Sequence, residues 1–148
     1  MLKTALIFII PVTWLLVFTS MAPLKEDLVE DVFRHTNQFR RSKGLPAFEM
    51  RNDLNAIARK HSEEMASGRR SFGHVGFSQR EKQIKNIFKT CTTAENVAYG
   101  ANNGKEAFDI WKRSSGHKKN MLGKYRYVGI GTAKSKKGVI YYTQIFVN

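Results

Sequence analysis

The sequence predicts an α/β fold, a three-layer α/β/α sandwich around a small antiparallel sheet. Several segments carry apolar residues at helical spacing, and the chain closes with two strands joined by a hairpin turn. The last strand, residues 138–147, has apolar or aromatic side chains on both faces, which predicts helices on either side of it. With 148 residues, 42% of them hydrophobic, the chain is long enough for one such domain and too short for two.

The N-terminus has the pattern of an export signal. Lys3 is followed by an uncharged, largely apolar run from Thr4 to Leu24, with the small residues Ser20 and Ala22 at a cleavage-like site. The run is also long enough to span a bilayer. We therefore expect residues 1–22 to be a signal peptide or an N-terminal membrane anchor, with attachment through residues 4–24. Residues 23–27 then form a linker and 28–148 the domain, which would be secreted, periplasmic or membrane-anchored facing outward.

Helical periodicity predicts the elements that precede the closing strands. Residues 27–41 and 52–67 form helices, and His61 falls on the core stripe of the second, where we expect it to be a buried structural residue. Residues 80–90 form a helix with a lysine-rich outer face, and residues 92–99 a strand. The next helix begins at Asn103, a capping residue with Glu106 three places on, and ends at Ser114–Gly116. The closing strands are expected at 126–134 and 138–147.

Cys91 is the single cysteine, so no intramolecular disulfide is available, and it is expected to be a small core residue.

Three candidate site residues come from three separate segments. His74 lies in a glycine-rich loop, Glu95 is the only acid between Lys82 and Lys105, and His117 follows the expected helix end. An isolated carboxylate in a partly apolar segment needs a partner, which could be a histidine, a metal or backbone amides. We expect the three side chains to converge on one cleft.

Charge is distributed unevenly. Lysine and arginine total 25 against 12 aspartate and glutamate, a net charge of +13, and no acid occurs from Lys112 to Asn148. This predicts a cationic surface for an anionic partner. The residues assigned to this surface are Lys112, Arg113, Lys118, Lys119, Lys124 and Arg126.

Several ordered segments resemble one family, the CAP superfamily (cysteine-rich secretory, antigen 5 and pathogenesis-related 1 proteins; SCP domain) in its bacterial form. They are residues 61–66 (HSEEMA), 72–75 (FGHV), 94–98 (AENVA), 111–122, 128–131 (VGIG) and 142–146 (YTQIF). The resemblance implies an α/β/α sandwich with a cleft holding two histidines and two acids. Matching segments give His74, His117 and Glu95, while Ser114 stands at the position of the second acid.

Two interpretations of this set remain open. His74, Glu95 and His117 suit a divalent metal such as zinc, with an open coordination position. They equally suit a hydrogen-bond network that joins a loop, a strand and a helix end without any cofactor. A Ser114–His117–Glu95 hydrolase is disfavoured, because no nucleophile elbow surrounds the serine.

The leading functional hypothesis is an exported, non-enzymatic binding domain at the cell envelope that recognises an anionic component or a lipid. The alternative is a metal-assisted hydrolase using His74, Glu95 and His117. Nucleic acid is not expected as a partner, because no nucleic-acid-binding motif appears and the chain is expected to be exported. Ligand identity and oligomeric state are not predicted.

Overall fold

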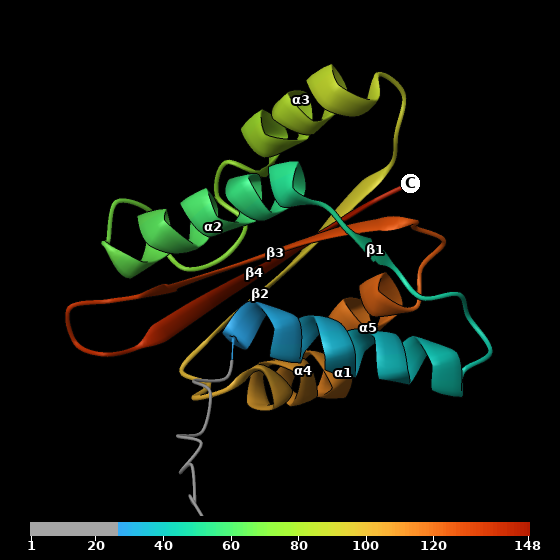
Figure 1. Cartoon of the computed structure of the whole chain (residues 1–148). Coiled ribbons are helices and arrows are strands. Elements are labelled where there is room, and N and C mark those ends of the chain that lie inside the picture. The colour runs from blue at the N-terminus through green and yellow to red at the C-terminus, as the bar shows by residue number, and fades with distance from the viewer. Residues whose placement is uncertain (1–26) are drawn as a thin grey trace, which may run out of the picture.

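Three layers of secondary structure make up residues 27–148, the part of the chain described by the computed structural model (Figure 1). The expected signal or anchor and residues 23–26 of the expected linker lie outside these residues. The elements are α1 (Leu28–Ser42), β1 (Glu49–Met50), α2 (Asn52–Ala66), α3 (Phe77–Phe88), β2 (Thr93–Tyr99), α4 (Gly104–Arg113), α5 (Ser115–Met121), β3 (Tyr127–Lys134) and β4 (Ile140–Val147). Within residues 27–148, no helix is both long and apolar enough to cross a bilayer.

The strands form one sheet in the order β1-β3-β4-β2. Strand β4 is antiparallel to β3 and to β2, while the two-residue β1 pairs in parallel with β3. Strand β2 is an edge strand, and side chains cover its open side. Its Glu95 carbonyl accepts a hydrogen bond from Asn120 Nδ2 at 3.3 Å, and its Val97 carbonyl accepts one from Trp111 Nε1 at 3.0 Å. These bonds satisfy backbone groups that would otherwise invite pairing with another chain.

The two faces of the sheet carry separate cores, which confirms the three-layer prediction. Helices α2 and α3 cover one face, and α1, α4 and α5 cover the other (Figure 1). On β4, Ile145 packs with the α2–α3 core, whereas Tyr142 and Phe146 pack with the core that includes Trp111. Strand β4 is therefore apolar on both sides because both sides are covered.

Helix α2 lies unusually close to β3. A Cβ atom at Gly131 would lie 2.0 Å from the Arg59 nitrogen, and one at Gly129 would lie 2.4 Å from the Leu54 carbonyl carbon. Only glycine permits this approach, and Ser62 Oγ then donates to the Gly131 carbonyl at 2.9 Å. This contact holds the side of α2 that carries His61 against the sheet.

Three local expectations needed correction. Helix α3 begins at Phe77 rather than residue 80, after Gly76 turns the chain in a left-handed conformation (φ 79°). The expected helix end at Ser114–Gly116 is present, because α4 ends at Arg113 and Ser114 is extended, but the chain does not continue as a loop: a second helix, α5, starts at Ser115. The completely buried Met121 anchors this short helix in the core, a tertiary effect that local sequence does not reveal. The third correction is β1, a two-residue strand that was not among the expected elements.

Candidate functional site

Glu95 on β2 is the centre of the candidate site, and an arginine binds both oxygens of its carboxylate. Arg80 of α3 donates from Nη2 to Oε1 and from Nε to Oε2, both at 2.7 Å. The Glu95 side chain is 2% exposed and that of Arg80 7%. A third Arg80 bond, from Nη1 to the Val75 carbonyl at 3.0 Å, fixes the guanidinium to the loop before α3. This is a buried bidentate ion pair, a geometry that the planar guanidinium favours.

His74 completes the contacts of the carboxylate. Its Nδ1 lies 2.9 Å from Glu95 Oε1. Because a carboxylate only accepts, Nδ1 carries the hydrogen of this bond. The His74 side chain is 51% exposed. Of the candidate residues, His74 is thus the one with an exposed imidazole.

His61 of α2 lies beneath this pair. Its Nε2 donates to the Gly73 carbonyl at 2.8 Å and lies 3.9 Å from Glu95 Oε1. Burial, and secondarily the positive charge of Arg80, lowers the pKa of His61. The ring is therefore neutral near pH 7. Its Nδ1 is buried and has no hydrogen-bond partner among residues 27–148.

His117 lies on α5 rather than at a loop corner, and it is half-buried. Burial lowers its pKa, and the charge of His74 lowers it further, so the two imidazoles are electrostatically coupled. The His117 Nδ1 is buried, and no atom in the described part of the chain forms a hydrogen bond with it.

A row of amides holds α5 against the sheet. Asn96 Nδ2 donates to the His117 carbonyl at 3.2 Å and lies 3.3 Å from Gln144 Oε1. Asn120 Nδ2 donates to Asn96 Oδ1 at 2.9 Å. From α1, the buried Arg40 donates to the carbonyls of Met121 and Gly123, both at 2.9 Å. The position of His117 is thus set by polar contacts on both sides of α5.

The structure joins His74 and Glu95 directly and places the other expected residues apart from that bond. Ser114 is half-buried at the junction of α4 and α5, and its side chain does not cap α5. Arg80 was missed as a site residue, because the expected partners of Glu95 did not include an arginine. The signal available was the isolation of Glu95 in the sequence. His61 was correctly expected to be buried, but not to lie beside the carboxylate.

The arrangement does not fit a zinc ion held by His74, Glu95 and His117. Both Glu95 oxygens already accept from Arg80, and a cation next to that guanidinium would be repelled. The His74 nitrogen nearest to the carboxylate is also committed to it. Among residues 27–148, no three histidine, cysteine, aspartate or glutamate side chains are grouped to hold a metal.

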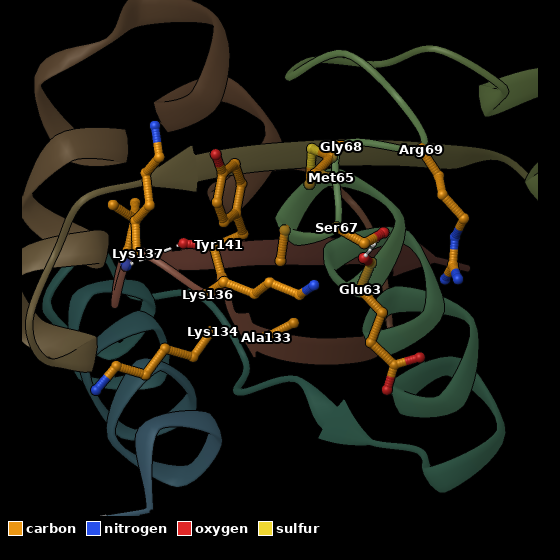
Figure 2. Close-up of a pocket in the computed structure, with 13 residues that line it drawn as sticks. Glu63, Met65, Ser67, Gly68, Arg69, Ala133, Lys134, Lys136, Lys137 and Tyr141 are labelled. Carbon is orange, nitrogen blue, oxygen red and sulfur yellow. Dashed lines mark hydrogen bonds between the residues drawn. The ribbon is translucent and has the colours of Figure 1, made fainter.

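One hollow borders the cluster formed by Glu95, Arg80, His74 and His61, and it is small. The hollow lined by His61 and Arg80 has a volume of about 50 Å³, whereas ligand pockets typically measure about 300–1,000 Å³. A hollow of about 810 Å³ lies instead between the end of α2 and the β3–β4 hairpin (Figure 2).

The six residues assigned to the cationic surface are all exposed. One of them is neutralised: Arg126 Nε lies 3.1 Å from Glu49 Oε1, an acid from outside the C-terminal third. Lys112 Nζ lies over the rings of Phe39 and Phe108, at 5.4 and 5.7 Å from their centroids. The other four extend from α4, α5 and the loop that follows.

Comparison with known proteins identifies the family. The model of the cysteine-rich secretory protein family, CAP, matches residues 33–146. The chain belongs to the CAP family. Two Bacillus subtilis (strain 168) proteins are each 30% identical to it: the uncharacterized membrane protein YlbC over 116 residues and the uncharacterized protein YkwD over 122. The matches cover 76% and 79% of this chain but only 32% and 47% of those relatives.

Solved structures show the same fold. An extracellular SCP-domain protein from Bacillus anthracis str. Ames superposes with a TM-score of 0.70 at 24% identity, covering 81% of this chain and 40% of that one. An outer surface protein from Borrelia burgdorferi superposes with a TM-score of 0.70 at 18% identity, covering 83% of this chain and 96% of that one. A cysteine-rich secretory protein from Staphylococcus aureus gives 0.66 at 26% identity, covering 84% and 40%. This CAP domain therefore shares its architecture with extracellular and surface proteins of bacteria.

Proposed function

We propose that this CAP domain is a non-enzymatic binding module that acts outside the cytoplasm, at the cell envelope, and recognises an anionic or lipid-like partner. The observation that carries the proposal is that both oxygens of Glu95 are already engaged. A carboxylate has about four acceptor sites, and Arg80 and His74 hold three of them, which leaves little of Glu95 to take a proton as a general base. The cluster instead joins α3, a loop and β2, which is a structural task.

The cationic surface supports the binding side of the proposal. Exposed lysines on α5 and in the loop after it have no acid near them in sequence, and each could add about 1 kcal/mol of attraction near an anionic membrane surface. The relatives with solved structures are described as extracellular or surface proteins, which supports a location outside the cytoplasm. Export is tested by fusing the full chain to a reporter that is active only outside the cytoplasm. Retention in the cytoplasm would contradict the proposal.

Binding is tested by co-sedimentation of a fragment that begins at residue 23, its fold checked by circular dichroism. The partners are anionic vesicles, neutral vesicles and cell-wall material. We expect binding to the anionic partners that fades as salt shortens the Debye length from about 10 Å at 0.1 M to about 3 Å at 1 M. Binding indifferent to salt and surface charge would contradict the electrostatic part.

Two matched variants distinguish binding by the cationic surface from an effect of the net charge of the protein. Lys118→Glu/Lys119→Glu reverses two charges on α5 and is expected to abolish most of the binding. Lys60→Glu/Lys82→Glu reverses two exposed charges on α2 and α3, on the other side of the sheet. Equal losses in the two variants would show that only the overall charge matters.

A further inference from the structure

The β3–β4 hairpin extends beyond the helix that covers it, and this leaves a groove. Helix α2 contacts the sheet at Gly129 and Gly131 and ends at Ala66, while the strands continue to Lys134 and Ile140. The hollow of about 810 Å³ lies between the end of α2 and the hairpin (Figure 2). Its size falls within the range of ligand pockets, about 300–1,000 Å³.

The groove has an apolar floor and a cationic rim. The floor residues are Met65, Ala66, Ala133, Val139 and Tyr141, and the rim residues are Arg69, Lys134, Lys136 and Lys137. All four rim residues are exposed, and none forms an ion pair with an acid of residues 27–148. Among the described residues that line the groove, Glu63 is the one acid. Its Oε1 lies 3.8 Å from Arg59 Nε. The rim therefore carries unneutralised positive charge.

A row of aromatic rings leads from the groove toward His74. Tyr141 is paired in register with Tyr99 of β2, and their rings stack with centroids 5.7 Å apart and planes at 20°. The Tyr99 ring lies 4.6 Å from that of Phe72, two residues before His74. Phe72 is 47% exposed and Tyr99 53%. No element of residues 27–148 covers these two rings, and contiguous exposed aromatic surface is typical of an interaction site.

We propose that the groove and the aromatic row together bind an acidic polysaccharide. The π faces of Phe72, Tyr99 and Tyr141 attract the weakly positive C–H bonds of sugar rings. The rim lysines bind the carboxylate or phosphate groups through charge-assisted hydrogen bonds, and their flexible stems tolerate irregular anion spacing. Several rings in succession suit a sugar chain rather than a single ion. The site shares no residue with the cationic surface above, and the inference depends on the proposed function only for its location outside the cytoplasm.

The experiment measures the affinity of the full chain, kept soluble in a neutral polyoxyethylene detergent, for four probes by isothermal titration calorimetry. Oligogalacturonate offers rings and charge, dextran oligosaccharide offers rings alone, poly(glycerol phosphate) offers charge alone, and oligothymidylate represents nucleic acid. We expect oligogalacturonate to bind tightest. Failure of oligogalacturonate to bind, or tighter binding of oligothymidylate, would overturn the proposal.

Variants assign the binding to the groove. We expect Lys134→Gln/Lys136→Gln/Lys137→Gln to weaken oligogalacturonate binding about tenfold or more, because three charge-assisted contacts are lost. Tyr99→Ala, at an exposed position, should weaken oligogalacturonate binding severalfold and leave poly(glycerol phosphate) binding unchanged. Lys60→Gln/Lys82→Gln/Lys89→Gln removes the same charge from exposed positions outside the groove and outside the surface used in the proposed function, so it should change the affinity less than about twofold.

The outcomes separate the two proposals. Equal losses from the two lysine variants would reduce the effect to net charge and overturn the groove. Unchanged oligogalacturonate affinity in the Tyr99→Ala variant would rule out stacking of sugar rings on the aromatic row. If vesicle binding by the α5 surface fails while the groove variants behave as expected, the proposed function loses its cationic surface and the groove stands.

Discussion

The Glu95 cluster and the hairpin groove show opposite uses of charge in one domain. In the cluster, a carboxylate is buried and both its oxygens accept hydrogen bonds from Arg80. In the groove, the lysines are exposed, and no acid of residues 27–148 forms an ion pair with them. The cluster joins elements from different parts of the chain, whereas the groove leaves its charges and rings uncovered.

This difference indicates which region stabilises and which binds. Removing one partner from a satisfied buried pair leaves an uncompensated charge, so changes in the cluster should affect folding. Exposed charges contribute little to stability, so changes in the groove should affect binding alone. The cluster is the region the sequence motifs single out, whereas the hollow of about 810 Å³ lies between the end of α2 and the β3–β4 hairpin.

The largest effect is expected from breaking the cluster. Arg80→Met removes the guanidinium and leaves Glu95 buried with His74 as its remaining partner, which should lower the free energy of unfolding by about 3–5 kcal/mol. Urea unfolding followed by circular dichroism measures this. Arg59→Met is the matched control, because Arg59 is exposed and pairs with Glu63 only at 3.8 Å, and it should cost less than about 1 kcal/mol.

The double variant Arg80→Met/Glu95→Gln distinguishes a lost charge balance from lost packing. Glutamine is neutral and can still accept from His74, so the double variant should recover much of the stability lost in the single one. A double variant as unstable as Arg80→Met would show that the arginine acts through packing. In that case the comparison between the two regions would not rest on charge.

A smaller loss is expected where α2 crosses β3, the contact that holds His61 over the sheet. Gly131→Ala would push a methyl group into the backbone of Ala58 and Arg59, and overpacking of this kind costs about 1–3 kcal/mol. Gly116→Ala on α5 is the control, since a Cβ atom there meets nothing within 4 Å, and alanine in a helix is favoured over glycine by about 1 kcal/mol. Equal stability of the two variants would contradict the close approach of α2.

The fold could be predicted from sequence because its signals are local and periodic. The two apolar faces of β4 predicted the layers, and the Asn103–Glu106 capping pattern is present as a 2.8 Å bond from the Glu106 nitrogen to Asn103 Oδ1. The helix end at Ser114 was predicted, but the second helix that starts at Ser115 was not, because the buried Met121 rather than the local sequence keeps α5 helical.

The site was less predictable, because its partners are distant in sequence. The isolation of Glu95 predicted that it needs a partner, but Arg80 reaches it only through the packing of α3 on the sheet. No sequence motif indicates the groove. It arises because a helix ends before the hairpin beneath it, and relative lengths of packed elements are a property of the assembled fold.

The smallest effect concerns pH. It tests whether folding keeps the buried rings of His61 and His117 neutral. Burial lowers the pKa of His61 and of His117 below the ordinary value of 6.5. As the pH falls through 6.5, the unfolded chain binds protons that the folded chain does not, so the free energy of unfolding falls, by at most about 1.4 kcal/mol per pH unit for each histidine. Urea unfolding from pH 7.5 to 5.5 should show this decline, and His61→Gln should make it shallower whatever its effect at pH 7.5. An unchanged slope in His61→Gln would mean that the folded protein protonates His61 as readily as the unfolded chain does. The groove should contribute nothing to this slope, because none of its lining residues is a histidine.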